Sequence, residues 1–307
     1  RGAGLAPLRW AIVLWRFGRP HTLIGTFVSV VSLYLVAVTV LPGHAVGDRP
    51  GDLLATLVAA LCVNVFIVGV NQLTDVEIDR INKPYLPIAA GALSPAGGLA
   101  IVVVAGIAPL VMALTQGALE TGAVLAGLAV GAAYSLPPVR LKRFPTPASL
   151  SISLVRGIVV NLGVYLHFSL TLTGEASIAA AVWALTLFVV PFSFAIAILK
   201  DVPDIEGDRR YAIATFSVRL GPEPVVRVAL AALTVSYLAM AAIGPFVLDE
   251  LSAPVLVAAH LGALALLWRS RARTDVSSVA SFTAFYMVVW KLFFLEYAAV
   301  ALAALAG

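Results

Sequence analysis

The chain has 307 residues, of which 61% are hydrophobic and only 12% are charged. A soluble domain carries about 25% charged residues, so this sequence has too little polar surface to face water on all sides, and a soluble enzyme is excluded. The net charge is +4. The positions of the basic residues between the apolar stretches explain this excess, and no nucleic-acid partner is expected.

Apolar stretches recur along the whole sequence, and each is close to the roughly 17–25 residues that a helix needs to cross a bilayer. Splitting the chain at charged and Gly/Pro-rich breaks predicts nine spans. In chain order they cover about 22–41, 53–72, 97–115, 119–136, 150–172, 177–199, 224–247, 254–269 and 279–304. Lipid offers backbone groups no hydrogen-bond partners, and the alternation of a barrel is missing. The sequence therefore predicts an all-α protein integral to a lipid bilayer.

Basic residues gather before the first span and after spans two, four, six and eight. They are Arg1, Arg9, Arg16, Arg19, Arg80, Lys83, Arg140, Lys142, Arg143, Lys200, Arg209, Arg210, Arg219, Arg269, Arg271 and Arg273. The opposite connections hold only Arg49. Because Lys and Arg are enriched in cytoplasmic loops, we expect the N-terminus and these loops in the cytoplasm and the C-terminus outside. The opening residue is not Met, so a trimmed start is expected, and no short apolar region predicts a cleavable signal peptide.

The long connections follow every second span, and the most acidic ones, after spans two and six, stand four spans apart. This pattern predicts a single membrane domain over residues 1–307, with repeated halves at about 20–145 and 150–275 and a ninth helix at about 279–304. A transporter with inverted repeats would place polar groups at mid-membrane. Here the polar loops share one face, so a transporter or a non-catalytic lipid-binding scaffold is the weaker alternative.

Seven of the 16 acidic residues lie in two short segments, at 71–80 and 200–209. In each segment, side chains with oxygen ligands recur at helical spacing: Asn71, Asp75 and Asp79, then Asp201, Asp204 and Asp208. On a helix each set would share one face, where aligned carboxylates repel one another. The cost grows near a membrane, so both sets need a cation. Hard oxygen ligands favour Mg²⁺ or Ca²⁺, and Mg²⁺ is commonly held together with substrate phosphate.

Two motifs resemble those of a known family. Asn71-x₃-Asp75-x₃-Asp79 with the following Arg80-Ile81-Asn82-Lys83-Pro84, and the later Lys200-Asp201-x₂-Asp204-x-Glu206-Gly207-Asp208, are similar to the motifs of the UbiA superfamily of intramembrane aromatic prenyltransferases. Four segments are most similar to its homogentisate prenyltransferase branch. They are Arg19-Pro20-His21-Thr22, the run 82–87, Tyr134-Ser135-x-Pro137-Pro138 with 141–143, and the run 216–221.

The resemblance implies nine helices around a central cavity that the two motif loops cap on the cytoplasmic side. It also implies a polyprenyl diphosphate donor held through Mg²⁺ and a small hydroxylated aromatic acceptor, homogentisate or hydroxybenzoate-like. A naphthoate, a chlorophyll-type pigment, haem or an alkaloid are alternative acceptors. Many members have DxxxD as the second motif, whereas this chain has Asp201, Asp204 and Asp208, which leaves open which two of the three hold metal.

The sequence thus yields a set of candidate site residues. The expected catalytic metal ligands are Asp75, Asp79, Asp201 and Asp208, with Asn71 and Asp204 in support. The candidate diphosphate contacts are Arg80, Lys83, Lys142, Arg143 and Lys200, for which a purely topological role is the alternative. Arg156, Asn161 and Lys291 lie within predicted spans and could reach donor or acceptor, because ionisable and polar groups in a membrane span mark functional sites. Pairing within the bundle is the alternative for these three.

Overall fold

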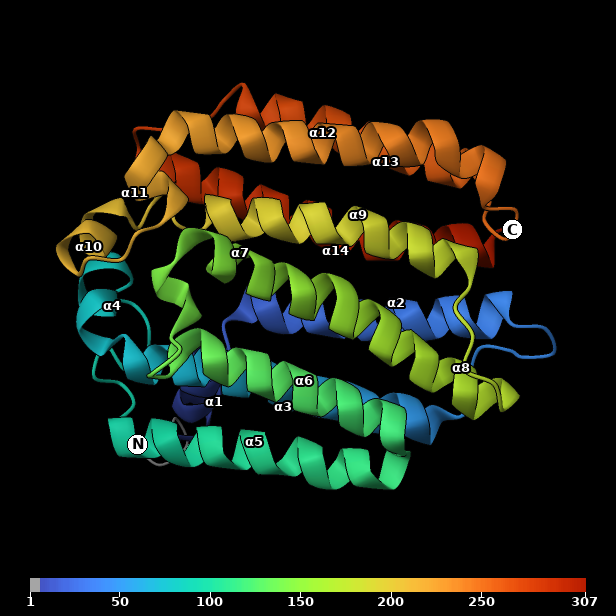
Figure 1. Ribbon diagram of the computed structural model, residues 1–307, viewed down its shortest axis with the longest axis horizontal. Helices are drawn as coiled ribbons and strands as arrows, with labels where there is room; N and C mark the ends of the chain where they lie inside the picture. Colours follow the sequence, from blue (N-terminus) through green and yellow to red (C-terminus); the bar gives the residue numbers. More distant parts are fainter. Residues whose placement is uncertain (1–5) are drawn as a thin grey trace.

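The computed structural model describes residues 6–307, so Arg1 lies outside the described residues. Within that range all regular secondary structure is helical, and nine helical segments are long and apolar enough to cross a membrane. The prediction of an all-α membrane protein with nine spans is therefore confirmed. The long helices run side by side in one bundle (Figure 1).

The membrane spans begin and end close to the predicted positions. They are α2 (Pro20–Val40), α3 (Pro50–Thr74), α5 (Pro95–Gln116), α6 (Ala118–Ser135), a fifth span of α7 (Pro145–Ser153), η3 (Leu154–Val164) and α8 (Tyr165–Thr173), then α9 (Ala180–Leu199), α12 (Pro222–Val247), α13 (Ala253–Arg271) and α14 (Val279–Leu305). The fifth span starts five residues earlier than predicted, at Pro145. Proline is tolerated in the first turn of a helix, where its missing N–H would have no partner anyway.

Five short elements were not predicted as separate helices. They are α1 (Ala6–Phe17), α4 (Val76–Asn82), the 3₁₀ turn η2 (Leu141–Arg143), α10 (Ile205–Arg210) and α11 (Phe216–Leu220). In Figure 1, α4, α10 and α11 lie together at one end of the bundle, and the C-terminus lies at the opposite end. The two acidic segments, which start at Asn71 and Lys200, are thus brought to the same end.

The middle of the fifth span is a π-helix. Its eleven residues, Leu154–Val164, carry Arg156 and Asn161. π-helical turns are rare and occur frequently at functional sites. Here the π-helix packs against both α6 and α9, so the residues that it carries lie between these two helices.

We expect Gly157→Ala to destabilise the protein, because a Cβ there would lie 2.6 Å from Val190 Cγ2 and 3.0 Å from the Val190 Cα. Overpacking of this kind costs about 1–3 kcal/mol, and thermal unfolding in detergent should show a lower Tm. Gly262→Ala in α13 is the matched control, because its Cβ would meet nothing within 4 Å, and alanine favours a helix by about 1 kcal/mol over glycine. Equal Tm values for the two variants would contradict the packing seen between η3 and α9.

Candidate active site

The first acidic segment is interrupted by a break in the helix. α3 ends at Thr74, Asp75 has φ −120° and ψ 20°, and α4 begins at Val76. Contrary to the expectation from spacing, the three ligand candidates of this segment do not share one continuous helix. The break leaves Asp75 in contact with its neighbour of the previous turn, since Asn71 Nδ2 donates to Asp75 Oδ2 at 2.9 Å.

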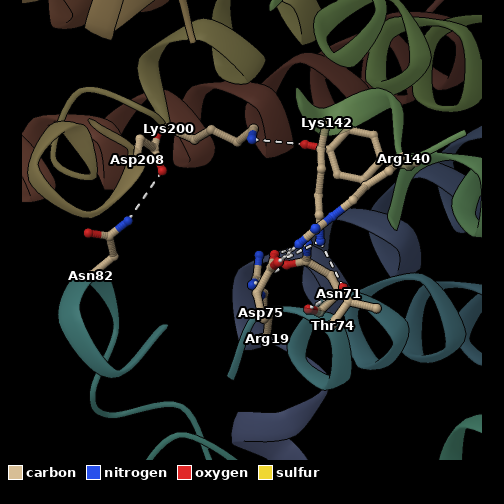
Figure 2. Close-up of polar contacts among 10 residues, drawn as sticks. Arg19, Asn71, Thr74, Asp75, Asn82, Arg140, Lys142, Lys200 and Asp208 are labelled. Carbon is tan, nitrogen blue, oxygen red and sulfur yellow. Dashed lines mark hydrogen bonds and ion pairs between the residues drawn. The ribbon is translucent and has the colours of Figure 1, made fainter. Parts of the chain in front are cut away.

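Basic side chains from a distant loop neutralise Asp75. Lys142 Nζ donates to Asp75 Oδ1 at 2.6 Å and to Thr74 Oγ1 at 2.8 Å, and Arg140 Nη2 lies 3.4 Å from the same Asp75 oxygen. Burial lowers the pKa of Lys142, and the charge of Asp75 opposes this effect. Figure 2 shows these side chains converging on Asp75. The pairing explains why a lysine is buried at this point of the chain.

The second acidic segment carries its own cation partners. Lys200 Nζ donates to Asp201 Oδ1 at 2.9 Å and to the Tyr134 hydroxyl at 3.0 Å. Asp204 forms an ion pair with Lys83, which directly follows α4. The Lys83–Asp204 pair therefore joins the first motif to the second.

Asn82 makes a further bridge between the two motifs. Its Oδ1 accepts a hydrogen bond from the Gly207 backbone N–H at 3.1 Å, and its Nδ2 donates to Asp208 Oδ1 at 3.3 Å. The latter bond is visible in Figure 2, on the side of the site away from Asp75. A Cβ at Gly207 would lie 2.1 Å from Asn82 Oδ1, so glycine is needed for this close approach.

Asp79 and Asp208 are the least compensated carboxylates of the site. Both are buried, and Asp79 Oδ2 has no hydrogen-bond partner among the residues that the structure describes. Burial raises the pKa of Asp79 to about 6, although Arg19 and Lys83 oppose the shift. Burial and then the charge of Asp201 raise the pKa of Asp208 to about 7. Buried negative charge without a partner is costly, and a cation bound at this point would relieve the cost.

The donor set suits a hard divalent cation that is shared with substrate. Within residues 6–307, no three His, Cys, Asp or Glu side chains are gathered closely enough to hold a metal ion unaided. Mg²⁺ is typically held by one or two carboxylates together with phosphate oxygens and water. The orphaned oxygen of Asp79 in the first motif and the carboxylate of Asp208 in the second fit such shared coordination.

A cavity extends from these motifs into the bundle. Its polar or amphipathic lining residues are Arg19, His21, Thr22, Thr26, Ser29, Asn64, Asn71, Glu120, Tyr134, Ser151, Arg156, Lys200, Tyr286 and Trp290. All the other lining residues are Gly, Ala, Val, Ile or Phe. The cavity is therefore polar where it meets the motifs and mostly apolar along its walls, as a site for a molecule with a charged head and a hydrocarbon tail would be.

Arg156 is the most unusual cation of the cavity. Its guanidinium carbon lies 4.5 Å from the ring centroid of Trp290 and 5.3 Å from that of Phe293. No carboxylate pairs with it among the described residues, and its buried Nη1 has no hydrogen-bond partner. Aromatic faces stabilise a cation but leave its N–H donors free for a ligand.

A model of the UbiA prenyltransferase family matches residues 26–295, which is most of the chain. The chain belongs to this family. It is similar to a homogentisate phytyltransferase of Synechocystis sp., with 46% identity over 286 residues that cover 92% of both chains. It is also 38% identical to a homogentisate geranylgeranyltransferase of Triticum aestivum, over 92% of this chain and 70% of the relative. The resemblance to the homogentisate branch is confirmed, and the protein is a membrane-embedded prenyltransferase.

The fold agrees with that of solved family members. A UbiA homolog from Archaeoglobus fulgidus, bound to GPP and Mg²⁺, superposes with a TM-score of 0.63 over 94% of this chain and 99% of that one, at 17% identity. At this identity the likeness establishes the helical architecture of the UbiA fold for this chain.

The structure brings most of the candidate site residues together and leaves four apart. Around the mouth of the cavity lie Asn71, Asp75, Asp79, Lys83, Lys142, Lys200, Asp201, Asp204 and Asp208, and Arg156 lines the cavity itself. Arg80 turns outward and pairs with the exposed Glu77 at 2.6 Å. Arg143 is exposed and lines, with Asp75 and Arg140, a separate hollow outside the cavity, and Lys291 is exposed on α14. Asn161 is buried outside the cavity lining and accepts a hydrogen bond from the Tyr297 hydroxyl at 2.5 Å.

Three contributors to the site were not identified from the sequence. Arg19 and Arg140 were counted as topology charges and Asn82 was given no role, yet Arg19 Nη2 donates to Asn71 Oδ1 at 2.9 Å. Both arginines have left-handed backbones, with φ of 54° and 43°, a strain of about 1–3 kcal/mol per residue that tends to cluster at functional sites. Sequence position could have identified the two arginines, because Arg19 directly precedes Pro20 and Arg140 stands two residues before Lys142.

We expect Asn82→Ala to lower kcat/KM for the prenyl donor by about 10- to 100-fold. The variant removes both hydrogen bonds that Asn82 makes to the second motif, and a hydrogen bond to a charged group is worth about 1.5–3 kcal/mol. Steady-state kinetics in detergent or nanodiscs would measure the loss. Arg80→Ala, two residues earlier on the exposed side, is the control and should retain nearly full activity. An equal loss in both variants would show that α4 as a whole, rather than the Asn82 bridge, is what matters.

Proposed function

We propose that this protein transfers a prenyl group from a polyprenyl diphosphate to homogentisate or a closely related hydroxylated benzenoid, releases diphosphate and depends on Mg²⁺. The observation that carries the proposal is the joining of two carboxylate sets, paired with Lys and Arg side chains, at the mouth of an apolar cavity. The relatives named for phytyl and geranylgeranyl transfer to homogentisate support this donor and acceptor class, and the GPP and Mg²⁺ of the Archaeoglobus homolog support the cofactor.

The metal would be held by oxygen ligands from both motifs. Asp79 and Asp208 are the leading candidates because no Lys, Arg or His side chain within residues 6–307 forms an ion pair with either. The other expected ligands are Asn71, Asp75, Asp201 and Asp204. When bound, Mg²⁺ acts as a Lewis acid that neutralises the departing diphosphate oxygens.

The basic residues of the site would exchange partners when the donor binds. Lys83, Lys142 and Lys200 now neutralise Asp204, Asp75 and Asp201. Once metal compensates these carboxylates, the three ammonium groups are free to donate charge-assisted hydrogen bonds to phosphate. Arg19 and Arg140, which lie beside Asn71 and Asp75, would add two more donors. The same five cations would thereby stabilise the protein without donor and bind the diphosphate of the donor.

The cavity would protect the reactive group that remains when diphosphate leaves. Departure of diphosphate from an allylic carbon leaves an allylic carbocation, which water would capture as readily as an aromatic acceptor. Mostly aliphatic walls exclude water, and the faces of Tyr134, Tyr286 and Trp290, which line the cavity, can stabilise positive charge. The aromatic acceptor then captures the cation through an electron-rich ring carbon and loses a proton.

Arg156 is placed to bind the carboxylate of the acceptor. Its guanidinium faces the cavity next to Trp290, and the His21 ring stacks edge-on to the same indole at 4.9 Å between centroids. A planar guanidinium with free N–H donors matches a carboxylate in two-point geometry. A hydroxylated phenylacetate would thus be held by its carboxylate, with its ring among aromatic side chains.

We further propose that the motif loops face the cytoplasm and the C-terminus lies outside, and that residues 20–145 and 150–275 are repeated halves. The positive-inside bias supports the orientation. The repeat is supported by the matching positions of α4, directly after the second span, and α10, shortly after the sixth.

Asp79→Asn and Asp208→Asn should each lower kcat by about 100-fold or more, as does the loss of one electrostatic stabiliser of a developing charge. EDTA should abolish turnover in the wild type, and added Mg²⁺ should restore it. Radiolabelled prenyl transfer to homogentisate would measure both effects. Glu77→Gln removes an exposed carboxylate from the same segment and should leave activity intact. Turnover that persists in EDTA, or equal losses in all three variants, would contradict a metal site at the two motifs.

Arg156→Met should raise the KM for homogentisate by about 10- to 100-fold, because a hydrogen-bonded charge pair is worth about 1.5–3 kcal/mol. The KM for the donor should stay unchanged. A hydroquinone acceptor without a carboxylate should react equally well with the wild type and the variant. Lys291→Met, at an exposed position one residue from Trp290, is the control. A rise in donor KM instead would assign Arg156 to the diphosphate.

The orientation predicts which introduced cysteines an impermeant maleimide can reach. In a Cys62→Ala background, a cysteine at Arg209 should be labelled only in inside-out vesicles, and one at Gly43 only in right-side-out vesicles. The reverse pattern would place the motif loops outside the cell.

A further inference from the structure

The cavity has a second polar end, far from the motifs. Glu120 lies in the first turn of α6, which starts at the end of the bundle opposite α4 and α10 (Figure 1). Its side chain lines the cavity and is only 3% exposed, and its Oε2 has no geometrically complete hydrogen bond to any residue of the described range 6–307. The positive end of the helix dipole favours an acidic residue in a first turn. The dipole alone does not account for a carboxyl group that is buried and lines the cavity.

The surroundings of Glu120 make this end of the cavity a polar floor beneath apolar walls. Thr56 of α3 is completely buried beside Glu120, where its hydroxyl can donate to the carboxyl group, and no other side chain within residues 6–307 pairs with its Oγ1. Nearer the motifs the walls are formed by small apolar side chains, among them Ala60, Val63 and Val124. A hydrocarbon chain gains free energy along such walls, but it gains none by pressing against the Glu120 carboxyl group and the Thr56 hydroxyl, which it would separate from water and from other polar partners.

The depth of the cavity can be read along α6. Tyr134, which touches Lys200 at the mouth, and Glu120, at the floor, line the cavity from the same helix. The rise of an α-helix places them roughly 21 Å apart. An extended carbon chain advances about 1.25 Å per carbon at ordinary bond lengths and angles. The cavity is therefore deep enough for about sixteen main-chain carbons, which corresponds to four isoprene units in head-to-tail linkage.

We infer that Glu120 is a specificity-determining residue that limits the donor to about four isoprene units by closing the tail end of the cavity. This inference rests on the proposed function for the identity of the donor. It adds the residue that sets the longest donor that the cavity accepts, and it predicts which substitutions lengthen or shorten that donor.

Equilibrium binding tests the inference without any prenyl transfer. Non-hydrolysable prenyl thiolodiphosphates with two to five isoprene units would be titrated into the protein in nanodiscs with Mg²⁺ and no acceptor. For the wild type, affinity should rise up to four units and fall at least tenfold at five. Equal affinity for four and five units would overturn the inference, because the tail would then leave the cavity sideways.

Three variants assign the limit to the floor. Glu120→Ala should move the optimum to five units, with at least a tenfold gain in the ratio of five-unit to four-unit binding. Glu120→Gln keeps the volume of the side chain and should keep the four-unit optimum. Val124→Phe fills the cavity one turn nearer the motifs and should move the optimum to three units, and this result stands even if Glu120→Ala fails to fold. An unchanged optimum in folded Glu120→Ala, or a shifted one in Glu120→Gln, would overturn the assignment.

The two proposals fail in different ways. Length-selective binding with no transfer to any aromatic acceptor would contradict the proposed function and leave Glu120 as the floor of a prenyl diphosphate site. Transfer to homogentisate with no preference for donor length would contradict the role of Glu120 and leave the proposed function intact.

Discussion

Carboxylates from two distant segments of the chain meet at the end of an apolar bundle, where the low dielectric constant strengthens every electrostatic interaction and raises the cost of unpaired charge. The chain meets this constraint by bringing a cation from each neighbouring element. Lys142 comes from η2, Lys83 follows α4, and Lys200 follows α9. Arg19 and Arg140 reach the site from strained backbones. Each of the three lysine-bearing segments is held at this end of the bundle by the ion pair that its lysine forms with a carboxylate of the site.

The same constraint links stability to substrate binding. In the proposed mechanism, a cation that forms an ion pair with a carboxylate in the absence of donor would become a phosphate ligand once metal bound that carboxylate. Asp79 and Asp208 remain partly uncompensated in the meantime, and burial raises the pKa of both. A protein without metal and donor therefore holds unfavourable charge that Mg²⁺ with diphosphate would neutralise. Binding energy would arise from relief of this repulsion as well as from new contacts.

Periodicity and composition predict the membrane spans well, because a bilayer demands long apolar helices whatever the tertiary contacts. The shared end of the two acidic segments also follows from the sequence, since both follow even-numbered spans. The break at Asp75 does not follow, because the i, i+4 spacing fits a continuous helix equally well and the ion pair with Lys142 spans 67 residues. Arg156 and Lys291 are equivalent as basic residues in apolar spans. Packing against Trp290 turns only the first toward the cavity.

The central claim is that carboxylates of both motifs share metal with the donor while the lysines of the site move to phosphate. A structure with Mn²⁺ and a non-hydrolysable prenyl thiolodiphosphate tests it most directly, because anomalous scattering locates the metal independently. We predict Mn²⁺ between the carboxylates of Asp79 and Asp208, with the Lys83 and Lys142 amines on phosphate oxygens. Metal and diphosphate bound elsewhere, with the Lys83–Asp204 and Lys142–Asp75 pairs intact, would contradict the claim.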